Sequence, residues 1–155
     1  MQLKIQNFEP SLIKPIYQLD KTYYGTTVKP NWYCRYVNKA KIVLCLENNK
    51  IVGYLIIANI SKKLFCNITN LKFSGDINFN SADFLTKSHY CYLPSILILK
   101  QFRQPNLPLI MINMALKHIK NKKICAICVS NEGTSMAKRF LNFVGKVSNS
   151  QVYSN

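Results

Sequence analysis

Apolar and polar side chains divide the first part of the chain into a strand and a helix. They alternate from Gln2 to Phe8, which is typical of a half-buried strand. From Glu9 to Tyr24 the apolar side chains recur at helical spacing, and Gly25 is expected to end this helix. Pro10 suits a first helical turn, whereas Pro15 is expected to break or kink the helix.

Two apolar runs around a polar turn predict a β-hairpin. The runs are Ile42–Leu46 and Ile51–Ile57, and Asn48 and Asn49 between them suit the positive φ angles of a tight turn. Before the hairpin, the aromatic segment Asn31–Val37 predicts a short helix or an aromatic loop. Core packing is the more common role for such a cluster, and lining a substrate site is the alternative.

The second half of the chain changes to an alternation of strands and helices. Leu64–Phe73 is expected to form a strand, and the polar segment Ser74–Tyr90 an irregular excursion of the kind that often shapes a site. The pattern then predicts a strand, a helix, a strand and a helix closed by Gly145, over Ile96–Leu99, Leu107–Ile119, Ile124–Val129 and Thr134–Val144.

Length and charge narrow the class of protein. A chain of 155 residues that is 48% hydrophobic predicts one globular domain over residues 1–155. Its 21 Lys and Arg against 6 Asp and Glu give a net charge of +15. This charge favours an anionic partner, either a phosphorylated cofactor, a nucleic acid, an acidic carrier protein or an anionic membrane surface. Codon bias toward lysine is the alternative explanation.

Six cysteines raise the question of disulfides or metal, and their positions argue against both. Several lie in apolar β-like runs, where cysteine is usually a small buried hydrophobe. Cys125 and Cys128 have C-x-x-C spacing, but an extended chain directs them to opposite faces. We therefore expect no metal site, and reduced thiols predict a cytoplasmic protein. No apolar run is long enough for a membrane span.

A basic turn between a strand and a helix is the strongest candidate for chemistry. It runs from Ile98 to Pro108 and contains Lys100 and Arg103. Strand–turn–helix junctions with a cation are where α/β proteins hold phosphate groups, because backbone N–H groups and the helix dipole converge there. The sequence therefore predicts an anion site at this turn.

The order of elements resembles the GNAT superfamily of acyl-CoA N-acyltransferases over nearly the whole chain. Glu47–Gly53 is similar to the family's hairpin, Ile98–Ile112 to its strand, pyrophosphate loop and helix, and Asn131 to a cofactor-contacting asparagine. The resemblance implies an α+β (α/β/α) fold with a mixed, mostly antiparallel sheet flanked by about four helices. It also implies transfer of an acyl group, most simply acetyl, from acyl-CoA to an amine.

The resemblance assigns roles to particular residues. The cofactor would be acetyl-CoA or another acyl-CoA, and a general base would take a proton from the acceptor amine. Candidates for that base are Glu132, His89 and Asp83. The cofactor-binding residues would be Ile98, Leu99, Lys100, Arg103, Gln104, Pro105, Asn106, Leu107 and Asn131.

This chain departs from the family pattern at three places. Asn106 and Pro108 stand where the family's loop has glycine or alanine, and Asn106 can adopt a left-handed conformation only at some cost. Leu141 stands where many members have a catalytic tyrosine, for which Tyr153, or Tyr90 and Tyr92, would substitute. Only Lys146–Tyr153 remains for a final hairpin, which would either weaken the substrate side of the site or hand it to a partner subunit in a homodimer.

These departures keep a second function open. A catalytically inactive GNAT-like protein would use its positive charge to bind RNA, DNA or an acidic partner. An active enzyme with the same charge would take its amine from a small molecule, a protein or an aminoacyl-tRNA. It would draw its acyl group from CoA or from an acidic acyl carrier protein.

Overall fold

The computed structural model describes residues 1–25, 29–119 and 122–155. Their contacts form two compact units. The first unit comprises Met1–Ile57 and Ser95–Lys120, and the second comprises Ala58–Pro94 and Asn121–Asn155. The single domain over residues 1–155 stays a prediction.

The first unit begins with the strand and hairpin that the sequence predicts. Strand β1 (Gln2–Asn7) pairs antiparallel with β2 (Ala40–Glu47). Strand β3 (Lys50–Ile60) follows after a turn in which Asn48 has a φ of 48° and Asn49 a φ of 62°. Asparagine tolerates this left-handed conformation better than most residues, so the prediction of a tight hairpin at this pair is confirmed.

Helix α1 (Ile13–Tyr24) follows a short 3₁₀ helix, η1 (Pro10–Leu12). The α-helix continues through Pro15 because this residue is in its first turn, where an N–H would have no intrahelical partner. Gly25 ends the helix in the left-handed conformation, with a φ of 59°, and this part of the prediction is confirmed. The expected break at Pro15 is wrong, because the helix starts later than its apolar pattern does.

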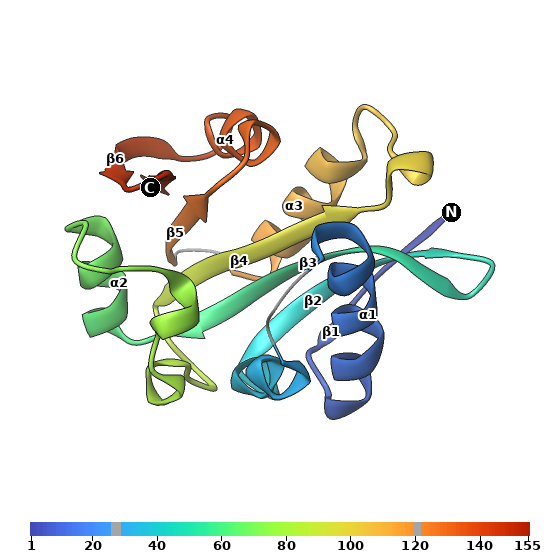
Figure 1. The fold of residues 1–155 in the computed structure, drawn as a ribbon, viewed down its shortest axis with the longest axis horizontal. Helices are drawn as coiled ribbons and strands as arrows, with labels where there is room; N and C mark the ends of the chain where they lie inside the picture. The colour runs from blue at the N-terminus through green and yellow to red at the C-terminus, as the bar shows by residue number, and fades with distance from the viewer. Residues whose placement is uncertain (26–28, 120–121) are drawn as a thin grey trace. The chain divides into compact units, whose positions relative to one another are not determined.

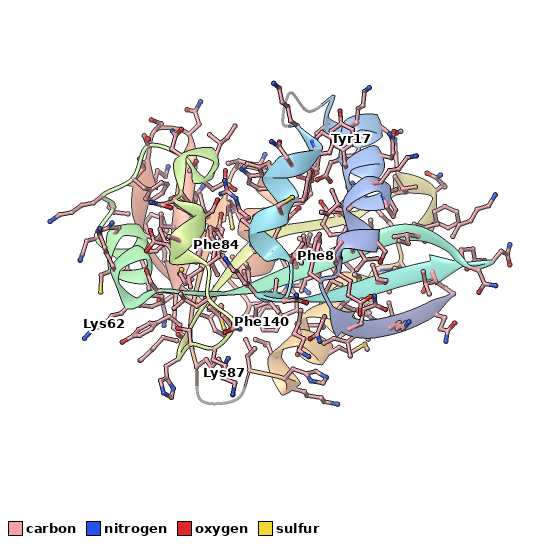
Figure 2. The ribbon with its side chains drawn as sticks, turned by 90° about the horizontal axis from the view of Figure 1, so that it is seen from below. Phe8, Tyr17, Lys62, Phe84, Lys87 and Phe140 are labelled. Carbon is pink, nitrogen blue, oxygen red and sulfur yellow. The ribbon has the colours of Figure 1, made fainter. Side chains whose placement is uncertain are left out.

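Helices cover both faces of the strands in the first unit. The aromatic segment forms a 3₁₀ helix, η2 (Pro30–Tyr36), so the short helix predicted there is confirmed. It lies with α1 on one face of the strands, whereas α3 (Leu107–Lys117) lies on the opposite face (Figures 1 and 2). Strand β4 (Tyr90–Ile98) and the 3₁₀ helix η5 (Lys100–Phe102) lead into α3, as the sequence predicts for a strand–turn–helix junction.

The second unit contains a helix where we expected a strand. Helix α2 (Lys62–Thr69) replaces the strand predicted over Leu64–Phe73. Ser61 caps it, since its hydroxyl accepts a hydrogen bond from the Leu64 N–H at 3.0 Å, and Leu64 and Ile68 are buried one turn apart. After α2 the polar excursion is irregular, as predicted, and contains two 3₁₀ turns, η3 (Asp76–Asn78) and η4 (Ser81–Asp83).

The C-terminal part of the second unit corrects two predictions. Strand β5 (Lys123–Cys128) is followed by α4 (Asn131–Ala137), which ends before Val144. The remaining residues form a hairpin of β6 (Asn142–Val147) and β7 (Ser150–Ser154). The final hairpin that seemed to be cut short is therefore present, and Gly145 belongs to a strand, beside an irregularity in the β6–β7 register.

The strands form a seven-stranded sheet in the order β1-β2-β3-β4-β5-β7-β6. Strands β4 and β5 are parallel, whereas β1–β2, β5–β7 and β6–β7 are antiparallel. The predicted α+β class with a mixed, mostly antiparallel sheet is confirmed. Among the described residues, no helix combines the length and the apolar character that a membrane crossing requires.

Candidate functional site

The predicted anion site lies in the first unit, between β4 and α3. Strand β4 is held to β3 at its end, where the Leu99 N–H donates to the Val52 carbonyl at 2.9 Å. The chain then turns through η5, and the Phe102 N–H donates to the Leu99 carbonyl at 2.9 Å. The loop therefore starts from a backbone position that β3 fixes.

Gly53 allows β3 to approach β4 this closely. A Cβ atom at this position would lie 2.8 Å from the Leu97 carbonyl oxygen, which is closer than van der Waals contact permits. The glycine of the Ile51-Val52-Gly53 sequence therefore has a packing reason that comes from the neighbouring strand.

Arg103 is oriented by two contacts. Its Nε donates to the Ile98 carbonyl at 3.0 Å, and its guanidinium donates to the hydroxyl of Tyr23 on α1. The guanidinium carbon also lies 5.4 Å from the centroid of the Tyr23 ring. The side chain remains exposed, so the loop presents an ordered cation to solvent.

The start of α3 leaves backbone donors available beside Arg103. Pro105 and Pro108 have no N–H, and the Leu107 N–H donates to the Gln104 carbonyl at 3.1 Å. Within the described part of the chain, no hydrogen bond is found for the N–H groups of Gln104, Asn106 and Leu109. Asn106 precedes the helix with a φ of −102°, so the loop does not use the left-handed conformation considered for it.

The backbone groups of Ile98 and Leu99 are already engaged within the protein. The Ile98 carbonyl accepts from Arg103, and both backbone groups of Leu99 take part in the bonds to Val52 and Phe102. A carbonyl oxygen has a second lone pair, so either carbonyl retains the capacity to accept another donor.

The predicted catalytic residues and Asn131 lie in the second unit. Asn131 and Glu132 are exposed in the first turn of α4, and His89 is exposed before β4. Asp83 is half-buried and accepts a hydrogen bond from the Ser61 hydroxyl at 2.5 Å. Its carboxylate therefore also holds the β3–α2 junction. Among the described residues, no hydrogen bond or ion pair links Asp83, His89 and Glu132 to one another.

A catalytic tyrosine four residues before Gly145 would require a helix up to that glycine, and α4 ends at Ala137. Gly145 is in β6, so Leu141, which is buried before that strand, does not mark a catalytic position. Of the proposed substitutes, Tyr153 is buried on β7 and its hydroxyl donates to Gln151 at 2.9 Å. Tyr92 is buried on β4 and donates to the Asp76 carboxylate at 3.3 Å.

Three cysteines of the second unit, Cys91, Cys125 and Cys128, are poor nucleophiles. Burial raises the pKa of Cys91 and of Cys128 to about 11, and burial raises the pKa of Cys125 as well. The thiols are therefore protonated at neutral pH, whereas nucleophilic attack requires the thiolate. They pack as small apolar groups.

The aromatic cluster of η2 is mostly core. The ring of Trp32 lies edge-to-face with those of Tyr33 and Tyr36, at centroid distances of 5.1 and 5.4 Å. Phe8 contacts Tyr36 in the same way, and the Arg35 guanidinium lies 4.5 Å from the Trp32 ring centroid. Figure 2 shows Tyr17, whose ring contacts Tyr33, on the same side of the strands.

A buried carboxylate beside this aromatic cluster was not predicted from the sequence. Asp20 on α1 is 8% exposed and accepts hydrogen bonds from the hydroxyls of Tyr33 and Tyr54. Tyr54, on β3, is 0% exposed, and its hydroxyl lies 3.0 Å from that of Ser95 on β4. The available signal was position, because Asp20 falls four residues after the buried Ile16 on the apolar face of the helix.

Burial changes the acid–base properties of this cluster. Desolvation raises the pKa of Asp20 above its ordinary value, and the hydrogen bonds from Tyr33 and Tyr54 oppose that rise. Burial and the neighbouring carboxylate raise the pKa of Tyr54 well above its ordinary value. The phenol is therefore a neutral donor at physiological pH.

Sequence comparison found no matching protein family and no matching curated protein. Solved structures match over almost the entire chain. NAA60 from Arabidopsis thaliana, in complex with acetyl-CoA, is 12% identical with a TM-score of 0.67, covering 99% of this chain and 98% of that one. The chain has the GNAT fold.

Two further structures show the same fold. Naa50 from Arabidopsis thaliana, in complex with the bisubstrate analogue CoA-Ac-MVNAL, has a TM-score of 0.66 at 10% identity and covers 100% of this chain and 99% of that one. A GNAT-family acetyltransferase from Bacillus cereus has a TM-score of 0.63 at 16% identity, with 100% and 97% covered. The predicted resemblance is confirmed at the level of the fold.

Proposed function

We propose that the protein is an acyl-CoA-dependent N-acyltransferase. The observation that supports this most is the junction of β4 and α3, where the ordered Arg103 guanidinium lies in the same short loop as the N–H groups of Gln104, Asn106 and Leu109. The GNAT fold adds support, since NAA60 with the same fold is known in complex with acetyl-CoA.

The loop fits an anionic pyrophosphate in part. Two prolines remove N–H groups from it, yet three backbone donors and a guanidinium remain, and a helix N-terminus favours negative charge. Bound acyl-CoA would supply an activated thioester. The residues proposed to hold it are Ile98, Leu99, Lys100, Arg103, Gln104, Pro105, Asn106 and Leu107 of the first unit. The cofactor contact of Asn131 is a separate proposal that comes from the resemblance alone.

The residues of the chain would contribute orientation and proton removal. A primary amine is protonated at neutral pH, so it needs a base before it can attack a thioester carbonyl. Glu132, His89 and Asp83 remain proposals for that base. The acceptor amine would belong to a small molecule, a protein or an aminoacyl-tRNA, and peptide amines are the first to test because Naa50 is known with a peptide-bearing analogue.

Thermal unfolding with acetyl-CoA tests the cofactor half of this proposal. A ligand at about 100 times its Kd stabilises a protein by about 2.7 kcal/mol, so a rise in Tm is expected. Arg103→Ala should reduce the rise at a given ligand concentration, whereas Lys117→Ala, at the other end of α3, should leave it unchanged. Absence of any shift at millimolar acetyl-CoA would contradict the proposal.

A second candidate function follows from the charge. Six carboxylates can neutralise only a minority of 21 Lys and Arg residues, so the surface is strongly cationic. Such a cationic surface is what a GNAT-like protein that binds RNA or DNA would have. Binding of a fluorescent oligonucleotide that weakens steeply with salt, without stabilisation by acetyl-CoA, would favour this function over acyl transfer.

A further inference from the structure

The hydroxyl groups of Ser95 and Tyr54 and the carboxylate of Asp20 form a line of hydrogen bonds in which each donor can be assigned. Tyr54 has a single phenolic proton, which it donates to an oxygen of Asp20. Its oxygen, 3.0 Å from that of Ser95, must therefore be the acceptor in the next bond, so the Ser95 hydroxyl donates to Tyr54. The lone pairs of Ser95 remain available to accept another proton. The line is oriented to pass a proton from Ser95 toward Asp20.

The two ends of the line differ in solvent access. Asp20 and Tyr54 are 8% and 0% exposed, whereas Ser95 is half-buried. Ser95 belongs to a half-buried stretch of β4, residues 93–96, that precedes the buried Leu97 and Ile98. Ser95 is therefore the end of the line that a ligand can reach.

Ser95 also lies on the strand that leads into the proposed cofactor loop. It precedes Ile98, the residue whose carbonyl orients Arg103, by three positions, which corresponds to roughly 10 Å along an extended strand. Both residues belong to the first unit. One strand therefore carries an accessible hydroxyl and, further on, the start of the anion site.

Packing alone gives an incomplete account of the cluster. A carboxylate loses solvation when it is buried, and apolar residues of similar volume often stabilise a protein as well or better. Tyr33 and Tyr54 satisfy the carboxylate of Asp20, but they do not require the third hydroxyl that extends the line to an accessible position.

We propose that Ser95, Tyr54 and Asp20, in place of Glu132, His89 or Asp83, form a proton relay that deprotonates the acceptor amine in acyl transfer. This rests on the proposed function. The substrate ammonium gives a proton to the Ser95 oxygen, the Ser95 hydroxyl proton passes to the Tyr54 oxygen, and the phenolic proton passes to the Asp20 carboxylate. The products are a neutral amine and a protonated Asp20. Ser95 is the residue that touches substrate, and Tyr54 and Asp20 act through it.

The electrostatics of the cluster suit this direction of transfer. Burial raises the pKa of Asp20, which strengthens it as a base, while Tyr33 from η2 and Tyr54 from β3 stabilise its ionised form by hydrogen bonding. Ser95 from β4 has no charge in the physiological range. A base of raised pKa takes up a proton more readily than an ordinary carboxylate does.

The test uses matched phenylalanine variants. The readout is release of free CoA from acetyl-CoA, with the peptide Met-Val-Asn-Ala-Leu as acceptor and with water alone. Tyr54→Phe and Ser95→Ala should lower kcat by on the order of 10²-fold or more, with a smaller change in KM. Tyr33→Phe removes the same kind of bond from the other carboxylate oxygen, off the path to Ser95, and should lower kcat at least tenfold less.

A pH profile separates a relay from a structural role. The wild-type kcat should fall as the pH is lowered and Asp20 becomes protonated, and this fall is the acid limb of the profile. Asp20→Glu should retain part of the rate. Asp20→Asn should lose most of the rate and should no longer show the acid limb. A ¹³C-carboxyl NMR titration of Asp20 should show the raised pKa without any substrate. Equal losses in Tyr33→Phe and Tyr54→Phe, or an acid limb that survives in Asp20→Asn, would overturn the relay.

Ligand stabilisation keeps this test independent of the cofactor proposal. Tyr54→Phe and Ser95→Ala should keep the rise in Tm that acetyl-CoA causes in the wild type. If the wild type is stabilised by acetyl-CoA but turns over neither with the peptide nor with water, the relay is overturned while cofactor binding stands. If the wild type is not stabilised and shows no turnover, both are overturned.

Discussion

Asp20 is an ionisable residue at a buried position. The carboxylate lies on the apolar face of α1, and its partners there are phenols, which satisfy its hydrogen bonds without neutralising its charge. Helical spacing alone gives such a position to an apolar residue. An ionisable group there indicates either a structural hydrogen-bond network or a role in catalysis. A neutral substitution such as Asp20→Asn affects stability in the first case and activity in the second.

Asp20→Asn should change the pH dependence of stability. The pKa of Asp20 is raised above its ordinary value of 3.8 on folding, so between the two values the folded state binds more protons than the unfolded state. Ionised Asp20 therefore disfavours folding, and wild-type stability falls as pH rises from 3.8 through the raised pKa.

The difference between the two proteins gives the measurement. We expect Asp20→Asn to be more stable relative to wild type at about pH 8 than at about pH 4, with the free energy of unfolding measured by urea denaturation. Glu9→Gln, at an exposed carboxylate, is the control. A relative stability that does not change with pH would mean that the pKa of Asp20 is not raised.

At the scale of elements, the position of each strand depends on its neighbour as much as on its own residues. Strand β3 needs a glycine at position 53 because β4 passes so close to it, and α2, which forms where a strand was expected, is capped by Ser61. Both features connect one element to the next. Each gives a substitution whose effect can be stated.

Gly53→Ala should destabilise the first unit. The new methyl group would lie 2.8 Å from the Leu97 carbonyl oxygen, and a backbone atom cannot rotate away as a side chain can. We expect a loss of about 1–3 kcal/mol in the free energy of unfolding, measured in urea. Gly133→Ala in α4 is the matched control, since its nearest neighbour is the movable Ser130 hydroxyl and alanine favours a helix. Equal effects at both positions would contradict the close approach.

Ser61→Ala should weaken α2. The substitution removes the cap on the Leu64 N–H and the hydrogen bond to Asp83, so we expect a loss of about 1 kcal/mol or more. Hydrogen exchange of the amides in the first turn of α2 should accelerate. Ser135→Ala, at an exposed position inside α4, should change stability much less. Unaltered exchange in α2 would show that the helix does not depend on this cap.

At the scale of the whole molecule, the net charge of +15 opposes folding because like charges are brought together in the compact state. Screening by added salt should weaken this repulsion. Raising NaCl from about 20 to about 200 mM shortens the Debye length from above 10 Å to below it, so we expect Tm to rise. Sucrose at matched osmolality is the control for non-electrostatic effects. A constant or falling Tm would mean that the charges are spaced too widely to repel.

The elements with strong local signals were predicted, although β4 begins at Tyr90, six residues before the predicted start at Ile96. Alternation predicted β1, the asparagine pair predicted the β2–β3 turn, and continuous apolar runs predicted the ends of β4 and β5. The failures were in segments with mixed signals. The stretch 64–73 contains β-branched and aromatic side chains, but its residues up to Thr69 belong to helix α2. The last helix was extended across residues that pair with β7.

Some residues of the candidate site could be predicted from the sequence, and others could not. Arg103 and the loop residues were identified from sequence because their chemistry and their spacing are local. The Asp20 cluster was not, because Asp20, Tyr33, Tyr54 and Ser95 come from four separate elements and meet only when α1, η2, β3 and β4 pack together. Sequence separation conceals such a cluster, because nothing local links its members.

The amino-acid sequence by itself determined the β2–β3 turn, the strand–loop–helix junction at Arg103 and the basic surface. These features depend on residues close together in the chain or on composition. The tertiary structure alone decided that α2 is a helix, that the chain closes with a β6–β7 hairpin, and that a carboxylate is buried among hydroxyl groups. These outcomes depend on burial and pairing between distant segments, and the free energy of such contacts exceeds local preference.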